Sequence, residues 1–147
     1  MRTLVVLLTL PLLVACSGQT SAPASSEDAD AAEPLMLGSI DLNQPLRAIG
    51  TEPFWAVEMT PANLTYSGVD RPEQAFPNPG PDIQGTTAVY AVEIAGGSSM
   101  TVTLMTTECS DGMSDRLYPL TATVEVGDET FNGCAQSVAA LAAEPRP

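Results

Sequence analysis

The chain has 147 residues with 18 acidic and 5 basic side chains, a formal net charge of −13 at pH 7, and no histidine. This charge excludes nucleic acids and anionic membrane surfaces as partners, because both require a basic footprint. Catalysis by Ser-His-Asp or Cys-His groups is excluded too, since their general base is missing. A cationic protein would be attracted, although the simpler interpretation is that acidity keeps an exported protein soluble.

The N-terminus has the features of an export signal. Arg2 precedes an apolar run over residues 3–14, which is shorter than the roughly 20 residues needed to cross a bilayer. We interpret residues 1–15 as a signal peptide. The closing sequence LVAC, residues 13–16, resembles the lipobox of bacterial lipoproteins. The resemblance implies that Cys16 carries several acyl chains and anchors the protein stably. An ordinary secretory peptide with an incidental cysteine is the alternative.

The next segment has the composition of a tether. In lipoproteins of this kind an Asp after the lipidated cysteine favours the inner membrane, and here that residue is Ser17. We therefore expect an outer-membrane anchor with the domain facing the periplasm. Residues 17–34 are rich in Ser, Ala, Pro, Asp and Glu and contain no aromatic residue, so they cannot offset the entropy of ordering. The prediction is a lipidated Cys16 and flexible acidic linker over residues 16–45.

Residues 46–136 are expected to form one folded domain, followed by a short Ala-rich tail over residues 137–147. Hydrophobicity in the domain alternates with a period of two, which is typical of half-buried strands. One strand is expected over residues 54–59. Its Trp55 is predicted to be a core residue, because an indole buries more apolar area than its neighbours could. A shorter strand follows over residues 64–66.

Two β-hairpins are predicted after these strands. The first covers residues 86–107 around Gly96-Gly97, and the second covers residues 120–134 around Gly127-Asp128. Alternating faces of this kind bury one side of an antiparallel sheet. The predicted fold class is all-β, a small antiparallel β-barrel or sandwich with a single core.

Prolines interrupt the pattern between Asp70 and Gly85, where four of them occur. Proline cannot donate to a sheet, so this segment is not expected to be a strand interior. It is predicted to be a long loop of the kind that is often functional or mobile. Phe76 at its centre is expected either to anchor the loop on the core or to contact a partner.

The remaining cysteines are expected to pair. With Cys16 lipidated, Cys109 and Cys134 are left in an oxidising compartment. A disulfide would close a loop of about 26 residues, which is worth on the order of 3 kcal/mol. Two free thiols acting as metal ligands are the alternative, but they lack histidine partners.

The stretch CSDGMSDRLYP, residues 109–119, concentrates the polar chemistry of the chain. A carboxylate pair such as Asp111 with Asp115, or Glu52 with Glu58, could in principle hydrolyse glycosides, but spacing alone does not raise a pKa, and we expect no enzyme. Asp111 and Asp115 lie four positions apart on either side of Gly112. This spacing differs from that of calcium-binding loops, so at most a weak calcium site is expected.

A structural corner is the stronger interpretation of the same stretch. Asp111-Gly112 favours a tight turn with positive φ at the glycine, and Ser and Asp side chains satisfy turn amides. We expect Arg116 to pair with Asp115, Asp111 or Glu52. The candidate binding residues outside Phe76 are those of the loop: Ser110, Asp111, Ser114, Asp115, Arg116 and Tyr118.

Two family resemblances follow from these motifs. The sequence IGTEPFW at residues 49–55, the stretch CSDGMSDRLYP and the late GCA at residues 133–135 resemble an uncharacterised family of proteobacterial lipoproteins. That family has no established activity. The plan of lipobox, β-barrel, disulfide and loop also resembles the membrane-bound inhibitors of c-type lysozyme, whose recognition loop has an S-G-x-x-Y pattern. Residues 114–118 match it with Asp115 in place of glycine. The family's lysine is missing, and only Arg116 could replace it.

The sequence therefore predicts a monomeric, lipid-anchored envelope lipoprotein that binds or supports and does not catalyse, with no cofactor and no metal. Its partner is left open. The first alternative is inhibition of c-type lysozyme, a cationic protein, through residues 110–118. The second is weak binding of calcium or carbohydrate. Glu52, Trp55 and Gly112 are expected to have structural roles.

Overall fold

The computed structural model describes residues 33–69, 71–94 and 96–143. The predicted signal peptide, the predicted lipidation site Cys16 and residues 17–32 of the predicted linker lie outside the described residues. No helix within the described ranges is long and apolar enough to cross a membrane.

Strands dominate the described residues. Their bounds are β1 (Met36–Leu37), β2 (Ile40–Asp41), β3 (Leu46–Thr51), β4 (Phe54–Met59), β5 (Asn63–Gly68), β6 (Arg71–Pro77), β7 (Asp82–Gln84), β8 (Thr87–Ile94), β9 (Ser98–Met105), β10 (Cys109–Ser110), β11 (Leu117–Tyr118), β12 (Leu120–Val126) and β13 (Glu129–Ser137). A short helix, α1 (Val138–Ala143), follows β13.

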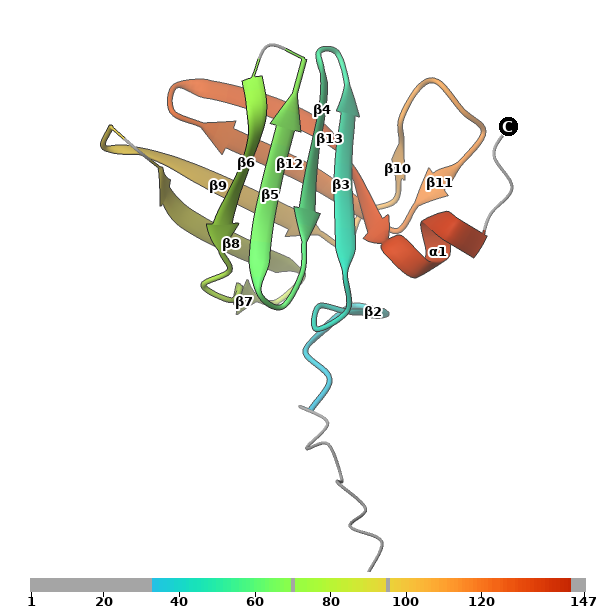
Figure 1. The fold of residues 1–147 in the computed structure, drawn as a ribbon. Helices are drawn as coiled ribbons and strands as arrows, with labels where there is room; N and C mark the ends of the chain where they lie inside the picture. The colour runs from blue at the N-terminus through green and yellow to red at the C-terminus, as the bar shows by residue number, and fades with distance from the viewer. Residues whose placement is uncertain (1–32, 70, 95, 144–147) are drawn as a thin grey trace, which may run out of the picture. The chain divides into compact units, whose positions relative to one another are not determined.

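Nine of these strands form one antiparallel sheet in the order β6-β5-β4-β3-β13-β12-β9-β8-β7. The sheet curls on itself into a half-barrel (Figure 1). β1 pairs with β2, and β10 pairs with β11, in separate two-stranded ribbons. The all-β prediction is confirmed, and a single curled sheet takes the place of a two-layer sandwich.

The core is the concave face of this sheet. One row of buried residues crosses five neighbouring strands in register and consists of Leu120, Ala135, Ala48, Val57 and Tyr66. Period-two alternation puts each of these side chains inward and its chain neighbours outward. The predicted strand at β4 and both predicted hairpins, β8–β9 and β12–β13, are confirmed.

Trp55 is buried as predicted, with 4% of its surface exposed. The indole packs where two glycines leave room for it, because a Cβ built on Gly50 or on Gly133 would clash with the ring. Gly133 also lies against the backbone of Ile49 on the neighbouring strand. Phe131 packs beside the indole with ring centroids 6.5 Å apart. Gly50 of the IGTEPFW motif and Gly133 of the GCA motif therefore both make room for the Trp55 ring.

The ordered domain begins before residue 46, so the predicted extent of the linker was wrong. The β1–β2 ribbon lies within the stretch predicted to be flexible. Leu37 is 1% exposed and Leu42 is 7% exposed, and both belong to the core. Apolar side chains at these positions gain enough burial to order a segment of otherwise polar composition.

The proline-rich segment is also more regular than predicted. It contains β6 and β7, which are the two edge strands of the large sheet. An edge strand tolerates proline, because one side of its backbone needs no partner. Phe76 lies on β6, half-buried and packed against the core. This confirms the anchoring interpretation of Phe76 over the exposed one.

Candidate functional site

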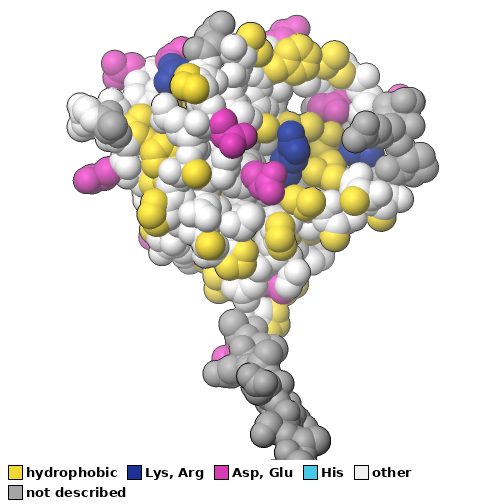
Figure 2. Space-filling model, viewed as in Figure 1, with side chains coloured by type: hydrophobic (Ala, Val, Ile, Leu, Met, Phe, Trp, Pro, Cys, Tyr) yellow, Lys and Arg dark blue, Asp and Glu magenta, His cyan; other side chains and the backbone are white. Residues whose placement is uncertain are grey.

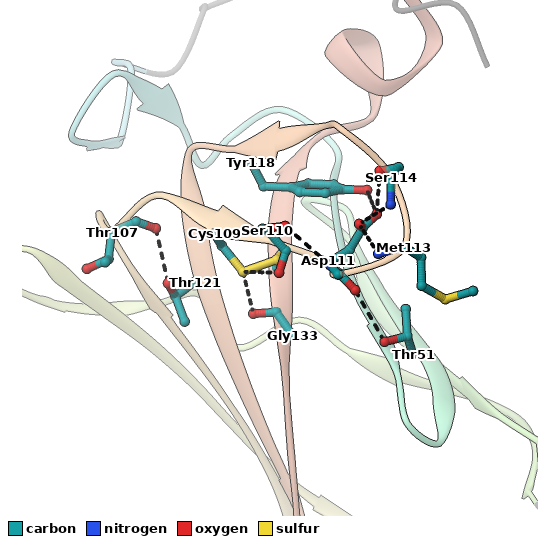
Figure 3. The surroundings of a disulfide bond; sticks show 12 residues. Thr51, Thr107, Cys109, Ser110, Asp111, Met113, Ser114, Tyr118, Thr121 and Gly133 are labelled. Atoms are coloured by element: carbon teal, nitrogen blue, oxygen red, sulfur yellow. Dashed lines mark hydrogen bonds between the residues drawn. A yellow bond between two sulfur atoms is a disulfide. The ribbon is translucent and has the colours of Figure 1, made fainter. Parts of the chain in front are cut away.

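The predicted disulfide is present and ties an extra ribbon to the barrel. Cys109 and Cys134 are bonded, with Cα atoms 5.5 Å apart. Ala135 points into the core, so Cys134, its neighbour in β13, belongs to the outer face. We call residues 109–119 the disulfide loop. The bond and β10–β11 hold this loop against the outer side of β13 (Figure 3).

The carboxylate of Asp111 is the centre of the disulfide loop. Its Oδ1 accepts hydrogen bonds from the backbone N–H groups of Met113 at 3.0 Å and Ser114 at 2.8 Å. Its Oδ2 accepts from the hydroxyls of Ser114 at 2.8 Å and Tyr118 at 3.1 Å. These side chains converge on Asp111 in Figure 3. Four donors therefore meet on one carboxylate.

Hydrogen bonding lowers the pKa of the Asp111 carboxyl group. Burial alone would raise its pKa, but the backbone N–H groups of Met113 and Ser114 and the two hydroxyls outweigh it and lower the pKa to about 2. In the opposite sense, burial and the Asp111 carboxylate raise the pKa of Tyr118. Asp111 is therefore charged, and Tyr118 protonated, throughout the neutral range.

The turn chemistry expected at Gly112 is confirmed. Gly112 has φ of 69°, a conformation that favours glycine. Its N–H donates to Ser110 Oγ at 3.3 Å, and the N–H of Arg116 donates to Ser114 Oγ at 3.3 Å. Thr51 at the end of β3 donates its hydroxyl to the Asp111 carbonyl at 3.4 Å. The loop is therefore fastened both to itself and to the barrel.

Arg116 was expected to pair with Asp115, Asp111 or Glu52. The hydroxyl of Tyr118 is one hydrogen-bond partner of its side chain. Glu52 is exposed, in a turn with a cis peptide bond to Pro53.

The side chains of the disulfide loop thus divide into two groups. Ser114 and Tyr118 direct their hydroxyls to Asp111 and are engaged inside the loop. The exposed side chains of its outer part are Met113, Asp115 and Leu117, of which Met113 is 67% exposed and Leu117 is 57% exposed. The outer part of the loop therefore exposes two apolar side chains and one carboxylate to solvent.

No cluster suited to metal binding occurs in the part of the chain that the structure describes: no three His, Cys, Asp or Glu side chains converge there. Both oxygens of Asp111 already accept hydrogen bonds, as described above. The acids at Glu52 and Glu58 are exposed on the surface.

Asp111→Asn is expected to lower the free energy of unfolding at pH 7 by about 1.5 kcal/mol, because an amide cannot accept from all four donors. The folded-state pKa of Asp111 is depressed from 3.8 to about 2. Its charge therefore stabilises the fold above about pH 4, and this stabilisation is lost as the pH falls toward 2. Solvent screening at this partly exposed group limits the pH-dependent part to about 1 kcal/mol.

The measurement is urea unfolding at several pH values between 2 and 7. The gap between wild type and Asp111→Asn should narrow below pH 4. Asp115→Asn is the matched control, because Asp115 is an exposed aspartate of the same loop. An equal loss of stability in both variants would show that Asp111 is not the centre of the loop.

A second feature, which the sequence analysis missed, is a groove on the outer face of β3, β4 and β5. Its volume is about 460 Å³, and we call it the outer groove. It is lined by Arg47, Ile49, Gly50, Thr51, Phe54, Trp55, Ala56, Ser67, Gly68 and Val69. Phe54 is 56% exposed and Val69 is 68% exposed. Figure 2 shows this face, with hydrophobic side chains around a hollow and a basic side chain next to it.

A neighbouring hollow of about 260 Å³ links the outer groove to the disulfide loop. It shares Ile49, Gly50 and Thr51 with the groove and extends to the disulfide and Asp111. The outer groove therefore ends at the ribbon that the disulfide holds in place.

The sequence did contain a signal for this groove. Phe54 and Ala56 occupy the face of β4 opposite to Trp55 and Val57, where polar side chains are expected on a solvent-facing strand. Ile49 on β3 lies opposite Ala56 in register and adds to the same apolar surface. A strand that is apolar on both faces indicates a contact surface on the outer one.

Comparisons with known proteins returned nothing: no protein-family model, no curated protein and no solved structure matches this chain.

Proposed function

We propose that this protein is a lipid-anchored, non-catalytic binding protein of the bacterial cell envelope, and that it contacts its ligand or partner through the outer groove. The lipobox-like sequence before Cys16 supports the anchor and the outer-membrane location. The resemblance of the IGTEPFW and CSDGMSDRLYP motifs to uncharacterised proteobacterial lipoproteins supports the same assignment.

The observation that carries the proposal is the contrast between the two outer features. The disulfide loop satisfies its polar groups internally through Asp111, as a scaffold does. The outer groove instead leaves Phe54 and Val69 exposed beside each other, next to the apolar side chains of Ile49 and Ala56. Exposed apolar patches with polar rims mark contact surfaces.

In-cell photo-crosslinking tests this proposal with the full chain. A photoreactive residue at Val69 should give a defined adduct, and the adduct should weaken when Phe54→Ser is added. The matched control position is Glu125, which is exposed on β12 outside the outer groove. No adduct from position 69, or the same adduct from position 125, would refute the groove as the contact surface. An adduct of two copies of the chain would contradict the predicted monomer.

Inhibition of c-type lysozyme is a less favoured alternative. Its recognition pattern depends on the Ser114 and Tyr118 hydroxyls, and both already donate to Asp111. A lysis assay with purified protein and lysozyme separates the two functions. Inhibition that is lost in Ser114→Ala and kept in Phe54→Ser would favour the alternative over the groove.

A further inference from the structure

A polar row borders the outer groove at one end. Gln136 of β13 lies opposite Arg47 of β3, and Arg47 lies opposite Glu58 of β4. Their chain neighbours Ala135 and Ala48 belong to the core. Gln136, Arg47 and Glu58 therefore belong to the outer face of the sheet. Arg47 is two positions before Ile49 on β3, so the polar row lies next to the apolar lining of the groove.

Two neighbouring donors in this row have no acceptor. Gln136 is 3% exposed, and its Nε2 has no hydrogen-bond partner among the described residues. Arg47 is exposed, and within the described ranges its guanidinium makes no hydrogen bond or ion pair. The other described arginines are engaged, Arg71 with Glu129 and Arg116 with Tyr118. Of these two donors Arg47 lines the outer groove, so its guanidinium is the group that a ligand in the groove can reach.

We propose that the outer groove binds a single-chain amphiphile with a carboxylate head, of the fatty-acid class. The carboxylate pairs with the guanidinium of Arg47, the basic side chain in the lining of the groove. The chain lies along Ile49, Ala56, Phe54 and Val69. This inference rests on the proposed function, because it takes the outer groove as the binding surface.

Charge and size narrow the ligand to this class. The planar guanidinium of Arg47 matches a carboxylate in a bidentate arrangement. Glu58 across the strand and the net charge of −13 disfavour a doubly charged phosphate. A volume of about 460 Å³ lies in the lower half of the range of small-molecule sites, which suits one acyl chain better than two.

Titration calorimetry with decanoate tests the proposal on the chain from residue 17, which lacks the lipid and contains the whole described domain with its core and disulfide. The fluorescence of Trp55, the single tryptophan, gives a second readout beside the groove. Decanoate should bind, whereas butyrate, with the same head and no long chain, should not. Decanol, with the same chain length and no charge, should bind about tenfold more weakly.

Variants assign the head and the chain separately. Arg47→Gln should weaken decanoate binding about tenfold and leave decanol binding unchanged. Glu58→Gln should strengthen decanoate binding about threefold by removing a like charge. Phe54→Ser should weaken both ligands. Arg71→Gln is the matched control, because Arg71 lies outside the groove lining and should not affect decanoate.

Absence of decanoate binding would overturn the proposal, as would an Arg47→Gln variant that binds decanoate as well as wild type. Tighter binding of decyl phosphate than of decanoate would overturn the carboxylate assignment. If position 69 still crosslinks to a partner while decanoate does not bind, the ligand assignment fails and the proposed function stands. If both experiments fail, both proposals fall.

Discussion

Trp55→Ala is expected to lower the free energy of unfolding by about 4 kcal/mol, the largest effect of any single substitution considered for this domain. The indole is 4% exposed and fills the space over Gly50 and Gly133. Alanine would leave a cavity that the two glycines, having no side chains, cannot fill. Chemical denaturation at neutral pH measures the loss.

The adjacent Phe54→Ala is the matched control. Phe54 belongs to the same strand and has similar size, but it is 56% exposed. Its replacement should change the free energy of unfolding by no more than about 0.5 kcal/mol. If both variants lost similar stability, the indole would not be the centre of the packing at this end of the barrel.

Removal of the disulfide by Cys109→Ala with Cys134→Ala is expected to lower the free energy of unfolding by about 3 kcal/mol. The bond joins residues 25 positions apart, and closing a loop of this length restricts the unfolded chain by about that amount. The bond also fixes the ribbon that carries Asp111 to β13. We therefore expect hydrogen exchange in residues 109–119 to become faster than in β8 and β9.

A reducing agent provides the control for the disulfide. It should destabilise wild type to about the level of the double variant and leave the double variant itself unchanged. Equal stability of the oxidised and reduced wild-type protein would contradict a stabilising role for the bond.

The sequence predicts well where neighbouring residues decide the structure. Alternation of apolar and polar side chains is a local signal, so β4, β5 and the hairpins β8–β9 and β12–β13 could be predicted from it. The pairing of Cys109 with Cys134 followed from the number of cysteines left after Cys16. Asp111-Gly112 indicated the turn in the disulfide loop, because its chemistry is also local.

Distant contacts decided the elements that the sequence did not reveal. β6 contains Pro72 and Pro77, and only its position at the edge of the sheet makes it a strand. The β1–β2 ribbon is ordered because Leu37 reaches the core. In both cases tertiary structure overrides a composition typical of loops or linkers.

The candidate site shows the same division. The sequence indicated that the loop residues form one polar group, but not that the hydroxyls of Ser114 and Tyr118 face inward, because they meet Asp111 only in the folded state. The outer groove needs three strands side by side, and its Ile49, Ala56 and Ser67 meet only through strand register. No local pattern gives that juxtaposition.

The edges of the half-barrel have a consequence for association between copies of the protein. An incompletely closed sheet can recruit strands from other molecules and grow into fibrous aggregates. Here the terminal strand β6 lacks two N–H groups at Pro72 and Pro77, and β7 at the opposite end has three residues. Both borders are poor templates for added strands, so copies of the domain at high local concentration can remain separate molecules.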